Sequence, residues 1–307
     1  MEPPVAFFVF NRPDTTQRVF EAIARAKPRR LLVVADGPRL DRAGEADACA
    51  RARAVLEAVD WDCEVRTNYS DVNLGCRRRV SSGLDWIFSV AEQAVILEDD
   101  CVPHPDFFPF CAALLDRYRD DDRIMAISGS NFHKGRRWGD GSYYFSRYVD
   151  VWGWATWRRA WQYYDVNLRV LPAFLEQWAM GRLSSEPEIR HWLDVLRATY
   201  DGLIDTWDYQ WLFAVWLQRG LVAVPNVNLV SNIGFGPRAT HTKDGYCAYA
   251  ALQTSPLGNL YHPRVVERHL EADLHYIRIR MTRPYSHRVR GYFRRRFDWL
   301  REQIVRP

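Results

Sequence analysis

The sequence predicts an α/β protein with a mixed, mostly parallel central sheet flanked by helices. Three observations carry this prediction: short apolar runs recur along the first 130 residues, a helix-forming segment follows most of them, and polar residues stand where the runs end. Strands that alternate with helices pair in parallel through right-handed crossovers. At 307 residues, 48% of them hydrophobic, the chain has enough material for a substantial core.

The expected elements follow from hydrophobic runs and from residues that start or stop helices. Strands are expected at residues 5–10, 30–35, 63–67, 94–97 and 124–128. Helices are expected at residues 14–26, 42–59, 77–91, 106–118 and 211–219, the first capped by Asp14, Thr15 or Thr16.

Polar side chains follow three of the predicted strands directly. Asn11 and Arg12 follow the first strand, Asp36 follows the second, and residues 98–100 follow the fourth. In a parallel sheet the carboxyl ends of the strands form the edge where ligands bind. These residues are therefore expected to converge on one edge of the sheet.

Glu98, Asp99 and Asp100 are three consecutive acids after a buried strand. Crowded carboxylates repel one another and resist desolvation, so a positive charge is expected beside them. Oxygen ligands suit Mn²⁺ or Mg²⁺, which uses one or two protein carboxylates and completes its shell with water and phosphate. Strand alternation predicts that Glu98 and Asp100 point to one side and Asp99 to the other. A solvated acidic turn is the structural alternative.

The net charge of +4 is too small to indicate a nucleic-acid partner. Residues 281–307 nevertheless carry eight arginines among aromatic and aliphatic side chains. Such a basic amphipathic tail suits an anionic membrane surface, or else packs on its own domain. No apolar run is long enough for a membrane span, and the start of the chain has no signal-peptide pattern, so a cytoplasmic protein, peripheral at the inner membrane face, is expected.

The cysteines form no CxxC pair, which argues against a zinc or disulfide framework. Buried free thiols are expected at Cys49, Cys63, Cys76, Cys101, Cys111 and Cys247.

The segment VILEDDCVPHPDFFPF, at residues 95–110, resembles the N-acetylglucosaminyltransferase I family and its protein-O-mannose relatives, in which a Glu-Asp-Asp motif precedes a Pro-Asp-Phe-Phe helix start. Further matches follow in the same order over residues 5–245. They lie at residues 9–12, 34–37, 153–154, 206–208 and 232–236. The resemblance implies a GT-A fold, which is a Rossmann-like nucleotide-diphospho-sugar transferase fold, a UDP-sugar donor, Mn²⁺ or Mg²⁺, and inversion at the anomeric carbon.

The resemblance also implies roles for single residues. Asp100 would be the metal ligand, Asp36 would accept a hydrogen bond from uracil, and Asp208 would be the general base that takes the proton of the acceptor hydroxyl. The other nucleotide-sugar-binding residues implied are Phe10, Asn11, Arg12, Glu98, Asp99, Gly153, Trp154, Trp207, Arg238 and His241.

Each of these roles has a plainer alternative. Asp208 could merely favour the positive end of a helix dipole, and Asp205 is its rival as the base. Residues 232–242 read as a lid that closes over phosphate, or as an ordinary surface loop. Trp154, Trp157 and Trp161 have the spacing of one helical face, and most tryptophans here are expected in the core.

The resemblance divides the chain into a nucleotide-sugar-binding half at residues 1–130, an acceptor-binding and catalytic half at 131–245, and a basic aromatic extension at 246–307. The function expected from it is an inverting transfer of a sugar, GlcNAc first, to a saccharide or glycolipid acceptor. Two alternatives stay open. A sugar-phosphate nucleotidylyltransferase has a similar fold and acidic metal site, although it usually carries a Gly-rich basic loop that residues 5–13 lack. A non-catalytic carbohydrate-binding protein would also be rich in aromatic residues.

Overall fold

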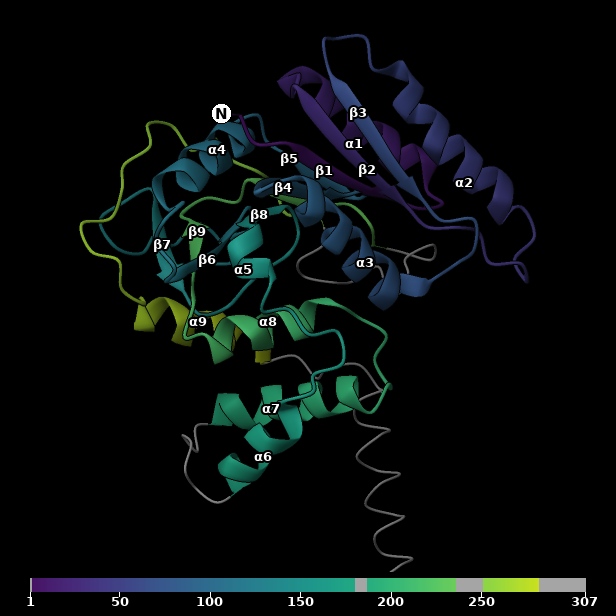
Figure 1. Ribbon diagram of the computed structural model, residues 1–307. Helices are drawn as coiled ribbons and strands as arrows, with labels where there is room; N and C mark the ends of the chain where they lie inside the picture. The colour runs from purple at the N-terminus through teal and green to yellow at the C-terminus, as the bar shows by residue number, and fades with distance from the viewer. Residues whose placement is uncertain (1, 180–186, 236–250, 282–307) are drawn as a thin grey trace, which may run out of the picture.

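The computed structural model describes residues 2–179, 187–235 and 251–281, and an eight-stranded sheet forms its centre (Figure 1). The strands lie in the order β3-β2-β1-β4-β8-β6-β9-β7. They are β1 (Val5–Val9), β2 (Arg30–Ala35), β3 (Glu64–Tyr69), β4 (Gln93–Glu98), β6 (Ile124–Ser128), β7 (Tyr143–Ser146), β8 (Trp154–Trp157) and β9 (Leu221–Pro225). Strands β7 and β8 run opposite to the rest of this sheet. The predicted mixed, mostly parallel central sheet flanked by helices is confirmed.

Helices cover both faces of the sheet because its central strands are apolar on both sides. In β1, Val5, Phe7 and Val9 face one core cluster, and Ala6 and Phe8 face the other. The first cluster is completed by α1 (Pro13–Ala26), the 3₁₀ helix η1 (Val55–Ala58) beyond α2 (Glu45–Ala54), and α4 (Phe107–Arg117). The second is completed by α3 (Gly75–Val90), α5 (Arg158–Trp161) and α8 (Asp208–Leu217).

A smaller helical layer lies at one end of the molecule. Helices α6 (Leu171–Ala179) and α7 (Pro187–Tyr200) lie below α8 and α9 (Leu270–Met281) in Figure 1. Leu171, Leu193, Leu196 and Phe213 form the apolar cluster that joins α6, α7 and α8. This layer packs on the helices and leaves the carboxyl ends of the parallel strands open.

A second, two-stranded sheet lies directly after the acidic motif. Strand β5 (Cys101–Pro103) pairs antiparallel with β10 (Val230–Asn232), and Asn232 is opposite Cys101. The backbone N–H of Ile233 then donates to the carbonyl of Asp100 over 2.8 Å. This pairing brings residues 232–235 against the end of β4.

The elements predicted in the first half of the chain are confirmed to within a few residues, but two details are wrong. Helix α1 begins at Pro13, and the hydroxyls of Thr15 and Thr16 donate to the carbonyl of Arg12 instead of capping the helix. The tryptophans at 154 and 157 lie on β8, so they cannot share a helical face. Trp154 packs in one core cluster and Trp157 in the other.

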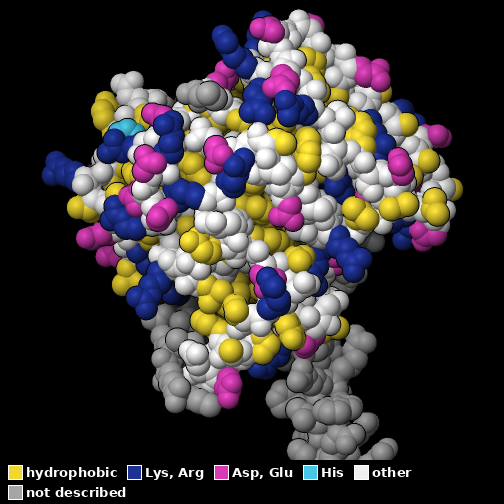
Figure 2. Space-filling view, in the orientation of Figure 1, with side chains coloured by type: hydrophobic (Ala, Val, Ile, Leu, Met, Phe, Trp, Pro, Cys, Tyr) yellow, Lys and Arg dark blue, Asp and Glu magenta, His cyan; other side chains and the backbone are white. Residues whose placement is uncertain are grey.

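Charged side chains of both signs are interspersed over the face shown in Figure 2, without one large patch of a single sign. Among the described helices, none combines the length and hydrophobicity that crossing a membrane requires. The basic tail at residues 282–307 and Cys247 lie outside the described residues. Free cysteines are observed at Cys49, Cys63, Cys76, Cys101 and Cys111, of which Cys49, Cys101 and Cys111 are buried.

Candidate active site

A pocket of about 520 Å³ lies at the carboxyl ends of β1, β2 and β4. The structure brings seven of the expected site residues to its wall. They are Phe10, Arg12, Asp36, Glu98, Asp99, Asp100 and Asp208. The strand ends thus meet at one edge because β1 pairs in parallel with both β2 and β4.

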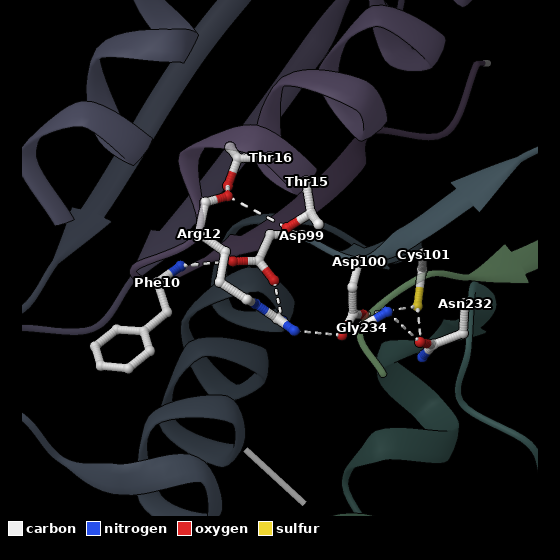
Figure 3. Close-up of polar contacts among 9 residues, drawn as sticks. All are labelled: Phe10, Arg12, Thr15, Thr16, Asp99, Asp100, Cys101, Asn232 and Gly234. Atoms are coloured by element: carbon white, nitrogen blue, oxygen red, sulfur yellow. Dashed lines mark hydrogen bonds and ion pairs between the residues drawn. The ribbon is translucent and has the colours of Figure 1, made fainter. Parts of the chain in front are cut away.

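Arg12 lies between two of the acids (Figure 3). One guanidinium nitrogen donates to Asp100 Oδ2 over 2.8 Å, and the other donates to Asp99 Oδ1. The second oxygen of Asp99 accepts the backbone N–H of Phe10 over 3.1 Å. The side chains of Asp99 and Asp100 are only 3% and 11% exposed, so this is a largely buried bridge.

The sequence predicted a positive charge beside these acids and named a metal ion as the candidate; in the structure a guanidinium holds that place. Arg12 supplies the positive charge, and although burial alone would lower its pKa, Asp99 and Asp100 raise the pKa above its ordinary value. The predicted alternation is wrong as well, because β4 ends at Glu98 and the next two acids turn toward the same guanidinium.

Glu98 differs from its two neighbours. Its carboxylate makes no hydrogen bond or ion pair with any described residue, and it lines the pocket. Burial, together with the like charges of Asp100 and Asp99, raises the pKa of Glu98 to about 8. The charge of Asp208 contributes in the same direction, which places these two carboxyl groups near one another.

The segment after β10 covers the acids at very short range. Gly234 lines the pocket, and its backbone N–H donates to Asn232 Oδ1 over 2.9 Å. A Cβ atom at Gly234 would lie 1.9 Å from Asp100 Oδ2 and 2.8 Å from the Arg12 guanidinium. Only a residue without a side chain fits here.

Asp36 is held by the loop before α3. Its oxygens accept the backbone N–H groups of Gly37, Leu74 and Gly75 and the side-chain amide of Asn73, over 2.9 to 3.1 Å. Burial raises the pKa of Asp36, while these backbone donors act to lower it. A carboxylate has about four lone-pair sites. All of them are engaged, so a nucleobase would have to displace a protein donor to bind Asp36.

Asn11 points away from the pocket wall. Its side-chain amide donates to Glu45 Oε1 over 2.8 Å, and Glu45 also forms an ion pair with Arg39. Arg39 lines the pocket with a side chain that is 41% exposed, and its guanidinium carbon lies 5.5 Å from the centre of the Phe10 ring. An aromatic ring and a cation therefore lie together at the pocket edge.

Asp208 is the first residue of α8, as expected for an acid that favours a helix N-terminus. The hydroxyl of Thr206 donates to its carboxylate. Its rival Asp205 lines the same pocket, so the structure does not separate the two by position.

The expected tryptophans lie away from the pocket. Trp154 is fully buried and stacks on Trp207, which is 3% exposed, with ring centroids 5.6 Å apart. Gly153, in a left-handed conformation with φ of 65°, packs against Val230. The tryptophan in the pocket wall is instead Trp152, whose ring packs edge-on against Phe235.

Several pocket residues were not expected from the sequence, and Arg238 and His241 lie outside the described residues. The unexpected ones include Arg39, Asn73, Cys76, Arg79 and Trp152, whereas Asn232 and Gly234 belong to the segment that was expected to lie over the site. Of the unexpected residues, only Arg39 had a sequence signal that could have identified it, because it directly follows Asp-Gly-Pro at the end of β2.

Cys76 lines the pocket as a thiol. Burial and the nearby carboxylates, Glu98 first, raise the pKa of this thiol well above its ordinary value, so Cys76 is no thiolate nucleophile at neutral pH.

The carboxylates of the pocket suit a cation whose remaining ligands are water and phosphate. No three metal-binding side chains gather into a preformed cluster within the described residues. Glu98 and Asp100 nevertheless offer hard oxygen atoms, and Mg²⁺ or Mn²⁺ commonly takes one or two carboxylates and completes its shell with water and phosphate. The residues present therefore fit such an ion.

No family model and no curated protein matches the chain. Among solved structures it is similar to the 4-diphosphocytidyl-2C-methyl-D-erythritol synthase of Anaerococcus prevotii, with 11% identity and a TM-score of 0.35 over 73% of this chain and 89% of that one. It is similar to UDP-glucose pyrophosphorylase complexed with UDP-glucose, with 10% identity and a TM-score of 0.37 over 73% of this chain and 90% of that one. It is also similar to HddC of Yersinia pseudotuberculosis, complexed with GMP-PN, with 10% identity and a TM-score of 0.30 over 50% of this chain and 77% of that one.

The expected inverting glycosyltransferase is corrected by these comparisons. Nothing found connects the chain with the N-acetylglucosaminyltransferase family, and the solved structures to which it is similar are named as a synthase and a pyrophosphorylase. At 10–11% identity the likeness is one of fold, and the reaction has to be supported by the chemistry of the site.

Proposed function

We propose that this chain binds a nucleoside triphosphate with a divalent cation and transfers the nucleotidyl group to a sugar phosphate. The observation that carries the proposal is the pocket itself, in which an arginine and three acids lie at the carboxyl ends of neighbouring parallel strands. Nucleotides bind at this edge of open α/β sheets. Phe10 and Arg39 offer an aromatic face and a cation for the base and the phosphates.

The charges of the pocket support a requirement for a cation. Six carboxyl groups and three arginines line it, so a triphosphate alone would meet net repulsion. Asp100 and Glu98 would hold the ion, and a bound Mg²⁺ or Mn²⁺ would neutralise phosphate charge and stabilise the leaving group. Arg12 can bind phosphate oxygens through the same two nitrogens that now bind carboxylates.

The reaction forms one phosphorus–oxygen bond and breaks another. A phosphate oxygen of the sugar phosphate attacks the α-phosphorus, and the bond from that phosphorus to the β-phosphate bridging oxygen breaks, which releases pyrophosphate. The attacking oxygen is already anionic, so no side chain has to remove a proton. The general-base role expected for Asp208 applied to attack by an acceptor hydroxyl in sugar transfer. In nucleotidyl transfer, Asp208 and Asp205 would instead accept hydrogen bonds from sugar hydroxyls.

The test is to incubate the protein with each of the four common nucleoside triphosphates, a panel of sugar 1-phosphates and Mg²⁺ or Mn²⁺. Pyrophosphate release and a nucleotide-sugar product identified by mass spectrometry are expected. Asp100→Asn should lower the rate by about a hundredfold or more, the loss typical of a group that stabilises a transition state electrostatically. Asp122→Asn, at an aspartate whose side chain is 94% exposed outside the pocket, is the control.

Two results would contradict the proposal. One is the absence of pyrophosphate with every nucleotide and sugar phosphate, in protein that remains folded. The other is release of a nucleoside diphosphate from a nucleotide sugar with the sugar found on an acceptor, because that product comes from attack on carbon and not on phosphorus.

A further inference from the structure

Arg12 is paired with Asp100, the residue to which the proposed function assigns the cation. Its guanidinium bridges Asp100 Oδ2 and Asp99 Oδ1, and the remaining oxygen of Asp99 is engaged by the N–H of Phe10. Gly234 closes the same side of the carboxylate. A divalent ion cannot reach Asp100 Oδ2 while this arrangement persists.

The surroundings of Arg12 oppose its leaving without a new partner. The side chain is only 20% exposed, and both of its terminal nitrogens are paired with carboxylates. A buried guanidinium that loses its carboxylates and gains nothing is strongly destabilised. A phosphate group offers the same paired oxygen geometry as a carboxylate, so it is a suitable new partner.

We infer that Arg12 and the divalent cation compete for Asp100, and that a nucleotide phosphate decides between them by drawing the guanidinium away. Binding is then ordered: the cation binds Asp100 together with the nucleotide or after it, and binds poorly alone. The part of this inference that concerns the nucleotide rests on the proposed function. The competition between Arg12 and the ion does not, since it needs only the ion pairs described here.

The test measures Mn²⁺ binding by the fall in the electron paramagnetic resonance signal of free Mn²⁺. Wild-type protein, Arg12→Met, Arg12→Lys and the control Arg30→Met are titrated with Mn²⁺ alone, and the wild type also with Mn²⁺ and each nucleoside triphosphate. Arg30 pairs with Glu64 over 3.1 Å outside the pocket, so its replacement also releases a carboxylate from an arginine. Circular dichroism and thermal melting establish that each variant is folded.

We expect Arg12→Met to bind Mn²⁺ alone at least about tenfold more tightly than the wild type, within the usual range of coupling between two ligands. Arg12→Lys should lie between them, because a lysine cannot bridge two carboxylates with a planar fork. Arg30→Met should match the wild type. A nucleotide should strengthen Mn²⁺ binding to the wild type by a similar factor, once the Mn²⁺ that the nucleotide takes up without protein is subtracted.

The outcomes separate the inference from the proposed function. Equal Mn²⁺ affinity of the wild type, Arg12→Met and Arg12→Lys would overturn the inference, even where the wild type binds nucleotide with Mn²⁺ as proposed. Tighter Mn²⁺ binding by Arg12→Met, without nucleotide binding to the wild type under any condition, would support the competition and refute the nucleotide-binding function.

Discussion

Replacing Gly234 by alanine tests how closely the segment after β10 packs on the acidic motif. The added Cβ would lie 1.9 Å from Asp100 Oδ2, 2.6 Å from Asp100 Cγ and 2.8 Å from a guanidinium nitrogen of Arg12. Non-bonded carbon does not approach other heavy atoms this closely. Either the Asp100 carboxylate leaves Arg12, or residues 232–235 move away from the end of β4.

The size of the effect follows from what these two movements break. Removing one partner of a buried ion pair costs about 3–5 kcal/mol, but Arg12 keeps Asp99 and the backbone at residue 234 can shift. An overpacked site typically costs about 1–3 kcal/mol. We therefore expect Gly234→Ala to lower the free energy of unfolding by about 1–3 kcal/mol, and to weaken binding of nucleotide with Mn²⁺ by about tenfold.

Urea unfolding followed by circular dichroism measures the first quantity, and calorimetric titration at a temperature well below the melting point measures the second. Gly141→Ala is the matched control, because its Cβ would lie 2.8 Å from the nitrogen and Cδ of Pro263, away from the pocket. It should lose stability and keep its ligand affinity. Wild-type stability and affinity in Gly234→Ala would refute the close packing of this segment on Asp100.

Three further predictions concern single side chains. The pKa of Glu98 is raised to about 8 from an ordinary value of 4.5, so stability should fall as pH rises from 4.5 through 8. Glu98→Gln should therefore be more stable than the wild type at pH 8 by about 4 kcal/mol. Urea unfolding at pH 5 and 8 checks this, and an equal difference at both values would contradict it. Burial, with the charge of His275, lowers the pKa of His133 to about 4, so stability is complete above pH 6.5 and falls toward pH 4. Between pH 7 and pH 5 the free energy of unfolding of His133→Phe should fall by about 2 kcal/mol less than that of the wild type. An unchanged dependence of the unfolding free energy on pH would argue against this. Trp154→Ala should cost about 3–5 kcal/mol in urea unfolding, against about 0.5 kcal/mol or less for Tyr163→Ala, whose residue is 48% exposed, and similar losses would contradict the core position of Trp154.

The first half of the fold could be predicted because its information is local. Strands β1, β2, β4 and β6 are apolar runs bounded by polar or helix-forming residues, whereas β3 is mostly polar and exposed. Strands β7 and β8 were not predicted, since aromatic residues dominate them and no alternation separates core from surface. Strand β9 was not predicted either, although it is a short apolar run. Trp154 shows the consequence, because a spacing that suits a helix belongs to a strand here.

The site was predicted to the extent that the ends of parallel strands must meet. That rule brings Arg12, Asp36 and residues 98–100 to one edge without any knowledge of side-chain positions. It says nothing of side-chain partners. Asp36 was expected to offer a free acceptor, whereas the loop before α3 engages all of its lone pairs.

The amino-acid sequence by itself determined the α/β class, the order of the first elements and the need for a positive charge beside three crowded acids, because periodicity and like-charge repulsion are properties of neighbouring residues. Only the tertiary structure decided that Arg12 supplies that charge and that Gly234 closes the site over Asp100. Arg12 is 88 residues from Asp100 along the chain, and Gly234 follows a different strand. Charge compensation and packing depend on distances in space, which the pairing of β1 with β4 and of β5 with β10 establishes.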